Sequence, residues 1–269
     1  MDIQTFFAEL WNDYIAMTPQ AQRIKAEFEA RGETVENDHV AFRTLALDPI
    51  NLASLEPHIL ALGYTRFEPY EFPEKKLKAQ GYLPPSAGQP RVFLSELLVD
   101  KLSPPAQAVL RRIAGEVDPA RVARPDVLWS GRLWKPIKWE EYELLQAESE
   151  YAAWLASIGI RPNHFTISVN GLKQHPEVED VLRVVEEIGC RVNESGGRVK
   201  GSRAVLLEQG STMADRVEQP FADGVHEVPT CYYEFAKRYP KPDGKLFDGF
   251  VAASADKIFE STDAKGGRS

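Results

Sequence analysis

The first thirty residues show the apolar pattern of helices, and the next segment shows that of a strand. Apolar side chains recur every three or four positions through residues 3–31, with a break at a Thr-Pro pair after residue 17 that predicts two helices. Residues 39–47 read instead as a core strand. Alternate residues of a strand face the same side, so His39 and Arg43 share one face of this otherwise apolar segment.

The chain continues in the order helix, strand, strand, strand. We expect the helix over residues 48–63, with Asp48 as its N-cap, Pro49 at its first position and Gly63 at its C-terminal stop. Three extended segments follow before residue 101, namely YTRFEPYEF, KLKAQGYLP and RVFLSELLVD. Together with the opening strand they make one unit of five elements.

A helical stretch interrupts the strands before the same order returns. Residues 104–160 contain two amphipathic helical patterns around the polar stretch WSGRLWKP, and we interpret them as an insertion. Beyond it come a strand with His164, a helix that ends at Gly189, and three strand candidates, RVNESGG, RAVLLEQ and TCYYEFAKRY. Residues 206–219 are rich in polar groups and are predicted to be a solvated loop.

The two strand-rich units form a repeat that is clearer in the order of its secondary-structure elements than in its amino-acid sequence. The first opens with NDHVAF and the second with RPNHFTI, so His39 and His164 occupy equivalent places. Each unit closes on a glutamate flanked by apolar residues, Glu96 in LSELL and Glu234 in YYEFA. If the first strands of both units join in a common sheet, the two histidines converge and Glu234 can reach the same point.

These three residues form a candidate metal site. A single histidine in an apolar stretch is more often structural than a ligand, but the equivalent placement of His39 and His164 in the two units favours ligands. Two neutral imidazoles and one carboxylate on one face make the ligand set of non-haem Fe(II) enzymes. The same set suits Zn(II), Mn(II) or Ni(II), so ligand identity alone does not choose the metal.

Arg43 and Glu96 each leave two interpretations open. A buried arginine needs an anion to offset the loss of its hydration. For Arg43 that anion is either an internal Asp or Glu or the carboxylate of a substrate, which its planar guanidinium can hold through two hydrogen bonds. Glu96 matches Glu234 in the sequences that close the two repeats, and it is either a fourth metal ligand or a structural glutamate. The other histidines, His58, His175 and His226, read as structural.

Composition narrows the classes of function. The chain has 269 residues and a formal net charge of −8, which argues against a nucleic-acid binder and weakly against binding to an anionic membrane. Cys190 and Cys231 are far apart and in no CxxC pattern, so we expect a reduced compartment. The first residues lack the features of a signal peptide, and no window is apolar enough for a membrane span. We therefore expect a cytoplasmic protein.

The motifs DHVAFRT, RPNHFTISVN and YYEFAKR, with the long insertion between the repeats, resemble the 2-oxoadipate dioxygenase/decarboxylase family. That family is similar in fold to the vicinal-oxygen-chelate enzymes, which are built from βαβββ units. The resemblance implies that His39, His164 and Glu234 bind the metal and that Arg43 binds a substrate carboxylate. It also implies a longer chain with a C-terminal portion that shapes the pocket, whereas this chain closes on DAKGGRS, which we expect to be a disordered tail.

The resemblance implies an Fe(II)-dependent reaction of O₂ with a 2-oxo acid. With 2-oxoadipate the products would be 2-hydroxyglutarate and CO₂. Two alternatives remain open at this point. One is a redox-neutral metalloenzyme of the glyoxalase type, an isomerase, lyase or hydrolase that uses Zn(II) or Ni(II), which Glu96 as a fourth ligand would favour. The other is a protein that binds a small acid without turning it over. The oligomeric state is not predicted.

Layout and resemblance together predict an α+β fold in which two βαβββ-type repeats form a curved mixed sheet around the metal site. We expect a single domain over residues 1–269. Its parts are N-terminal helices (1–36), a first repeat (37–103), a helical insertion (104–160), a second repeat (161–240) and a C-terminal segment (241–269).

Overall fold

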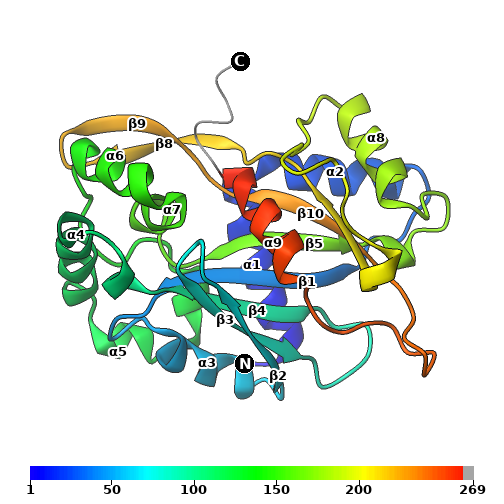
Figure 1. Ribbon diagram of the computed structural model, residues 1–269, viewed down its shortest axis with the longest axis horizontal. Helices are drawn as coiled ribbons and strands as arrows, with labels where there is room; N and C mark the ends of the chain where they lie inside the picture. The colour runs from blue at the N-terminus through cyan, green and yellow to red at the C-terminus, as the bar shows by residue number, and fades with distance from the viewer. Residues whose placement is uncertain (263–269) are drawn as a thin grey trace.

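Two helices lead into the sheet, as the Thr-Pro break predicts. The structure is a computed structural model that describes residues 1–262, so the expected tail at 263–269 lies outside the described part. Helix α1 (Ile3–Met17) begins after Asp2, whose side chain accepts a hydrogen bond from the Thr5 amide, and α2 (Pro19–Ala30) begins at a proline in its first position. Figure 1 shows α1 and α2 behind the central sheet.

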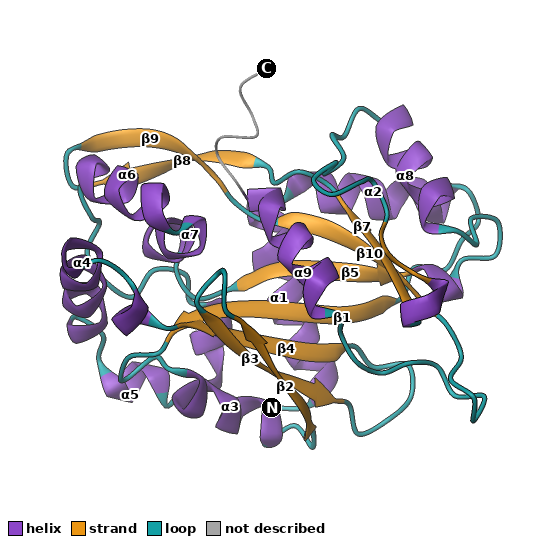
Figure 2. Ribbon diagram, viewed as in Figure 1, coloured by secondary structure: helices purple, strands orange, loops and turns teal. Residues whose placement is uncertain are grey.

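The central sheet has eight strands and joins the two repeats side by side. Its order is β2-β3-β4-β1-β5-β10-β7-β6 (Figure 2). The first strands of the repeats, β1 and β5, are antiparallel neighbours at the centre, while β4 lies parallel to β1 and β10 lies parallel to β5. The predicted α+β class and the shared sheet are thus confirmed. The strands are β1 (Asn37–Leu45), β2 (Thr65–Phe72), β3 (Leu77–Leu83), β4 (Arg91–Leu97), β5 (Pro162–Ser168), β6 (Lys200–Ser202), β7 (Leu207–Ser211) and β10 (Tyr232–Arg238).

Helices cover both faces of this sheet. On one face lie α1, α2, α3 (Leu52–Leu60) and α8 (Val178–Glu187), which contact β5, β10, β4 and β7 respectively. The other face carries α9 (Ala252–Phe259), which crosses in front of the strands in Figure 1. Strands covered on both faces lose the alternation of buried and exposed residues, and β1 is buried at every position after Asn37. Any charged side chain in β1 therefore needs a partner inside the protein.

The helical insertion packs against one end of β1. It contains α4 (Pro104–Gly115), α5 (Pro119–Val122), η2 (Pro125–Trp129), α6 (Trp139–Glu148) and α7 (Glu150–Ile158). Tyr151 of α7 fixes the contact, because its hydroxyl donates to the Ser95 carbonyl at 2.8 Å and accepts from the Thr44 amide at 2.9 Å. The insertion thus positions α7 beside the face of β1 that carries Arg43.

The predicted start of the first-repeat helix is wrong by three residues. Helix α3 begins at Leu52 with Asn51 as its N-cap, whose side chain accepts from the Ser54 amide at 2.9 Å. Asp48 instead accepts a hydrogen bond from the Asn51 side chain at 2.7 Å, and Pro49 lies in the preceding turn. Asn51 is equally suited to the N-cap and lies nearer the apolar run, so it takes the position that we assigned to Asp48.

Two predictions in the second repeat are also wrong. Residues 191–197 form no strand apart from one isolated bridge at Val192, because Gly196 and Gly197 have φ angles of 69° and 101° that strands do not adopt. The predicted loop 206–219 contains β7 and β8 (Arg216–Phe221), and β8 forms a hairpin with β9 (Gly224–Pro229). The polar side chains of the hairpin are all at least partly exposed, which is why its sequence resembles that of a loop.

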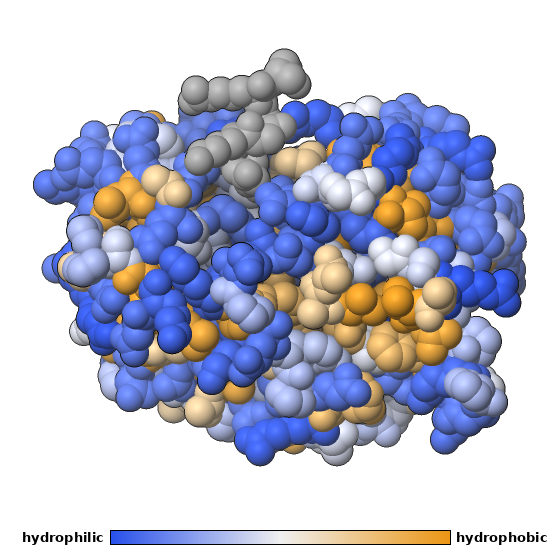
Figure 3. All heavy atoms as spheres, viewed as in Figure 1, coloured by the Kyte–Doolittle hydropathy of each residue, from blue (hydrophilic) through white to orange (hydrophobic). Residues whose placement is uncertain are grey.

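The surface is mostly hydrophilic on the face shown in Figure 3, with apolar areas separated by polar side chains. None of the helices in the described range 1–262 is long and apolar enough to cross a membrane. Both cysteines are free and buried.

Candidate metal centre

Three neighbouring strands bring the predicted ligands together. His39 lies on β1, His164 on β5 and Glu234 on β10, and these strands are adjacent in the sheet. The register pairs Thr166 with both His39 and Glu234, so all three ligand side chains leave the sheet on the same face. The convergence predicted from the repeat is therefore present.

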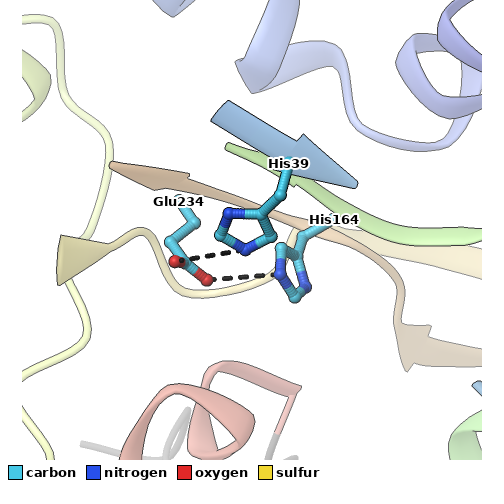
Figure 4. Close-up of side chains that lie close together, drawn as sticks. All are labelled: His39, His164 and Glu234. Carbon is cyan, nitrogen blue, oxygen red and sulfur yellow. Dashed lines mark ion pairs between the residues drawn. The ribbon is translucent and has the colours of Figure 1, made fainter. Parts of the chain in front are cut away.

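The three side chains form a compact, buried group (Figure 4). One ligand atom from each residue lies within 4.8 Å of the others, and the exposed fractions are 2% for His39, 4% for His164 and 1% for Glu234. The Glu234 carboxylate places Oε1 at 3.5 Å from His39 Nε2 and Oε2 at 3.2 Å from His164 Nε2. Metal–ligand bonds of about 2.0–2.2 Å hold ligand atoms at comparable separations. The arrangement is a buried site of two histidines and one glutamate, consistent with a metal cofactor.

The electrostatics of the site also fit a cation. Burial, together with the charges of His39 and Arg43, lowers the pKa of His164 well below its ordinary value, so the imidazole is neutral and can bind a metal. Burial raises the pKa of Glu234, although His39 and a hydrogen bond from Gln209 oppose the shift. A carboxylate that is costly to ionise here would be stabilised by a bound cation.

Each candidate ligand is oriented by a second side chain. Asp38 Oδ1 lies 2.8 Å from Nδ1 of His39, and Asn163 Oδ1 lies 3.1 Å from Nδ1 of His164. Both rings therefore use Nδ1 for a hydrogen bond and turn Nε2 toward Glu234, an arrangement typical of metal-binding histidines. Gln209 donates to Glu234 Oε1 at 2.6 Å. Asp38 and Asn163 stand directly before the two histidines in the sequence, but the pattern predicted no role for either of them.

A buried arginine fixes Asp38 in turn. Arg238 donates to both carboxylate oxygens of Asp38, at 2.7 and 2.8 Å, and to the backbone carbonyls of Phe247 and Gly249, at 2.9 and 2.7 Å. Burial alone would raise the pKa of Asp38, but Arg238 and His39 hold it well below its ordinary value. Arg238 thus connects the His39 side of the site to the segment that leads into α9.

Two aromatic rings enclose the histidines. Tyr232 stacks on His164 with ring centroids 4.6 Å apart, and Phe250 meets the edge of His39 at 4.9 Å. The Tyr232 hydroxyl is buried and has no hydrogen-bond partner among residues 1–262. A bound molecule beside His164 could accept a hydrogen bond from it.

Arg43 lies on the same face, toward α7 and the C-terminal turn. It is 1% exposed; its Nη1 lies 3.2 Å from Glu150 Oε2, and its Nη2 donates to the Thr262 hydroxyl at 3.0 Å. The internal carboxylate considered from the sequence is therefore present and is Glu150.

Glu96 lies outside the site. Its side chain leaves the opposite face of the sheet and accepts a hydrogen bond from the Leu52 amide at 2.9 Å, at the start of α3. The register of the first repeat pairs Ala41 with Phe93, as that of the second pairs Thr166 with Glu234, so Phe93 is the structural counterpart of Glu234. The structure therefore excludes Glu96 as a fourth ligand in this arrangement.

Known proteins share this arrangement of two repeats. Residues 7–128 and 126–245 match the family model described as 2-oxoadipate dioxygenase/decarboxylase. The chain belongs to the 2-oxoadipate dioxygenase/decarboxylase family. The resemblance of the three motifs to that family, and the prediction of an enzyme, are thus confirmed.

Three proteins illustrate the relationship. The chain is 38% identical to the chloroplastic 2-oxoadipate dioxygenase/decarboxylase of Arabidopsis thaliana over 84% of this chain and 67% of that protein. It superposes on the hydroxyglutarate synthase of Oryza sativa in complex with 2-oxoadipate with a TM-score of 0.92 and 34% identity, over 97% of this chain and 92% of the other. A structure from Shewanella frigidimarina, provisionally assigned as a hydrolase, gives a TM-score of 0.89 and 46% identity over 94% and 98% of the two chains.

In this member of the 2-oxoadipate dioxygenase/decarboxylase family, the C-terminal segment reaches the site. Phe250 packs on His39, and Thr262 of η5 (Glu260–Thr262) binds Arg43. Nothing in the sequence indicated that residues after 240 contribute to the site. Their apolar and hydroxyl side chains carry no distinctive motif.

The other histidines of this family member do not join the metal centre, as predicted. His58 Nε2 lies 2.8 Å from the Val122 carbonyl, and His175 Nδ1 lies 2.9 Å from Glu33. His226 is in β9 and stacks on Trp139 with centroids 4.1 Å apart.

Proposed function

We propose that this protein is an Fe(II)-dependent dioxygenase and decarboxylase of 2-oxoadipate. The reaction consumes one O₂ and yields 2-hydroxyglutarate and CO₂, so that both oxygen atoms enter the products. The observation that carries the proposal is the buried group of His39, His164 and Glu234 with Arg43 on the same sheet face, in a chain of this family. The rice relative, which covers almost the whole chain, is a hydroxyglutarate synthase in complex with 2-oxoadipate.

His39, His164 and Glu234 would hold the metal from three adjacent strands. Fe(II) held by these residues would supply the redox chemistry by which O₂ reacts with a 2-oxo acid. Asp38 and Asn163 hold the Nδ1 atoms of the two histidines, which leaves Nε2 of each ring to bind the metal, and Gln209 holds the carboxylate of Glu234.

Arg43 would bind the distal carboxylate of the acid. Four residues of extended strand separate the Cα atoms of His39 and Arg43 by about 13 Å, and the two side chains can reach toward each other across the span of a small dicarboxylic acid. The rings of Tyr151, Trp154 and Phe259 lie against the guanidinium and keep it dry. In such a setting a hydrogen-bonded carboxylate binds strongly, and an acid without one is rejected.

Turnover tests this proposal directly. Protein loaded with Fe(II) should consume O₂ and release CO₂ with 2-oxoadipate, and the acid product should be 2-hydroxyglutarate by mass. A panel of 2-oxo acids of different length, with and without a distal carboxylate, defines the range of substrates. Lack of turnover with every dicarboxylic 2-oxo acid would reject the function.

The metal is part of the same proposal. Zn(II), Mn(II) and Ni(II) suit the three ligands as well as Fe(II) does. Glu96 as a fourth ligand would have favoured a redox-neutral reaction of the glyoxalase type. Glu96 instead accepts a hydrogen bond from the Leu52 amide at the start of α3, so it does not support that alternative. Elemental analysis of protein purified without added metal, compared with the same analysis of a His39→Ala variant, identifies the ion that the site retains.

A cytoplasmic location also stays a proposal. The free, buried cysteines Cys190 and Cys231 suit a reducing compartment, and the plant relatives are named as chloroplastic. Cell fractionation with an antibody to the protein tests it. A small 2-oxo acid and O₂ are the proposed partners; a nucleic-acid partner is not expected at a net charge of −8.

A further inference from the structure

Arg43 is occupied by a carboxylate of the chain itself. Glu150 Oε2 lies 3.2 Å from Arg43 Nη1 and accepts a hydrogen bond from the Thr262 hydroxyl at 2.7 Å. The same hydroxyl accepts from Arg43 Nη2 at 3.0 Å. Glu150 therefore sits where the distal carboxylate of 2-oxoadipate would have to bind if Arg43 recognises it.

The ion pair between Arg43 and Glu150 is incomplete. Arg43 Nε and Glu150 Oε1 are both buried, and neither has a hydrogen-bond partner in the described range. A guanidinium in a dry pocket is best satisfied by two parallel hydrogen bonds to one carboxylate, and Glu150 supplies a single contact. A second carboxylate that uses more of the guanidinium edge would compete well against it.

The two partners differ in how firmly they are held. The Arg43 guanidinium lies 4.9, 5.1 and 5.6 Å from the ring centroids of Tyr151, Trp154 and Phe259. Glu150 is the first residue of α7, and its side chain is 15% exposed. It lines a cavity of about 190 Å³ whose lining also includes Glu74, Lys75, Lys76 and Glu148. Lys75 and Lys76 pair with Glu260 and Glu148, so the cavity offers Glu150 space rather than free positive charge. Arg43 is thus fixed, whereas Glu150 has room to move.

We propose that Glu150 is a specificity-determining residue. It pairs with Arg43 in the ligand-free enzyme, and the distal carboxylate of the substrate replaces it on Arg43 when the substrate binds. This inference rests on the proposed function. The exchange keeps one carboxylate on the buried arginine throughout, so Arg43 is never left without an anion, and the displaced Glu150 carboxylate would turn into the cavity that it lines. A 2-oxo acid without a distal carboxylate cannot replace Glu150 and gains nothing from Arg43.

Substitution of Glu150 separates this role from a structural one. The glutamine variant Glu150→Gln keeps the shape of the side chain and removes its charge. With Fe(II) present and O₂ excluded, calorimetry should find 2-oxoadipate bound about tenfold more tightly than by wild type, the change expected if Glu150 occupies Arg43 in about nine molecules of ten. Affinity for 2-oxohexanoate, which lacks the distal carboxylate, should stay the same.

Glu260→Gln is the matched control. Glu260 lies two residues before Thr262 and pairs with Lys75 at 2.9 Å, so the variant removes the same charge near the cavity without touching Arg43. Its affinity for both acids should stay within twofold of wild type. Equal gains in Glu150→Gln and Glu260→Gln, or a weaker binding of 2-oxoadipate by Glu150→Gln, would overturn the exchange.

A crystal structure of the wild-type enzyme with 2-oxoadipate under anaerobic conditions tests the same exchange without any variant. Glu150 should have moved beyond 4 Å from Arg43, with the distal carboxylate in its place. An intact Arg43–Glu150 pair beside bound 2-oxoadipate would refute this inference while leaving the proposed function standing. Wild-type protein that neither binds nor turns over any dicarboxylic 2-oxo acid would overturn both.

Discussion

The Oδ1 atom of Asp38 lies 2.8 Å from Nδ1 of His39. The two residues are neighbours in the chain, so the side chain of Asp38 reaches around to the ring of the next residue while its carboxylate is bound on the other side by Arg238. A carboxylate in this position fixes the ring orientation and makes Nε2 a better metal ligand.

The variant Asp38→Asn should therefore lower both the metal affinity and the free energy of unfolding. Metal affinity should fall about 10- to 100-fold, because the amide supplies a weaker acceptor to the imidazole. The free energy of unfolding should fall by about 3 kcal/mol, because Arg238 is left buried without its anion. Competition with a chelator measures the first effect and urea denaturation the second. In the control Asp248→Asn, which removes a partly exposed partner of Arg91 at 2.6 Å, both effects should be small.

Arg43→Lys should lower kcat/KM for 2-oxoadipate while leaving 2-oxohexanoate unaffected. Lysine keeps the charge but cannot present two parallel N–H groups to a carboxylate. A loss of about 2 kcal/mol, or roughly 30-fold in kcat/KM, is expected for hydrogen bonds to a charged group. Steady-state oxygen uptake with both acids provides the measurement. A parallel loss on both substrates would show that Arg43 serves the fold and not recognition of the distal carboxylate.

Tyr232→Phe should change stability and activity in opposite directions. The hydroxyl is buried and unpaired within residues 1–262, so its removal should raise the free energy of unfolding of ligand-free protein by about 1 kcal/mol. If the hydroxyl donates to the bound acid, kcat/KM should fall about tenfold, as for the loss of one hydrogen bond.

Tyr233→Phe provides the control for Tyr232→Phe. The Tyr233 hydroxyl is also buried and unpaired in the described chain, but its ring packs on the opposite face of the sheet, 5.9 Å from Trp11. This variant should gain similar stability and keep full activity. Equal kcat/KM in both variants would show that Tyr232 makes no contact with the substrate.

Gly159→Ala should destabilise the protein by about 3 kcal/mol or more, because two effects add. Gly159 ends α7 with a φ of 88°, and a Cβ atom built there would lie 2.1 Å from the carbonyl carbon of Gly131. Gly189 has a similar φ of 80° but no atom within 4 Å of such a Cβ. Gly189→Ala should therefore cost only about 1 kcal/mol, the backbone strain alone. Thermal or urea unfolding of both variants checks the difference.

Because Lys200 is buried, the free energy of unfolding should change with pH in the alkaline range. Burial lowers its pKa from 10.5 to about 8, although Glu234 and Glu194 oppose the shift. Between these two values the unfolded chain binds a proton that the folded chain does not, so the free energy of unfolding rises with pH. Below about pH 8 both states are protonated and the cost of burying the charge is fully present.

A comparison with Lys200→Met isolates this contribution of Lys200. The difference in unfolding free energy between wild type and variant should shift in favour of wild type as the pH rises from about 8 to 10.5. Urea denaturation across that range provides the measurement. A difference that does not change with pH would mean that the Lys200 ammonium is solvated in the folded state.

The sequence was informative wherever a local pattern determined the structure. The Thr-Pro break gave the division between α1 and α2, and the matching openings of the two units led to their shared sheet and to the convergence of His39, His164 and Glu234. The predicted equivalence of Glu96 and Glu234 was wrong because the sheet face on which a strand residue lies depends on the pairing register of the strand. The sequence does not give this register, and a shift of one residue moves a side chain to the other face.

Contacts between distant parts of the chain could not be predicted. Arg238 binds Asp38 from 200 positions away, and Thr262 reaches Arg43 from 219 positions away. Neither residue belongs to a periodic pattern that would place it near its partner. The β8–β9 hairpin was missed for another reason, since it is largely exposed and its polar side chains carry no burial signal.

The position of the centre at the boundary between β1 and β5 makes a bound ion a tether between the two halves of the chain. The first half would supply one ligand, His39, and the second half would supply His164 and Glu234, so neither could retain the ion alone. The position in the first half that corresponds to Glu234 holds Phe93, which packs on Phe250 at 4.8 Å. The two halves would thus contribute unequally: the second supplies two of the three ligands, and the first supplies the third together with Arg43, the residue proposed to bind the acid.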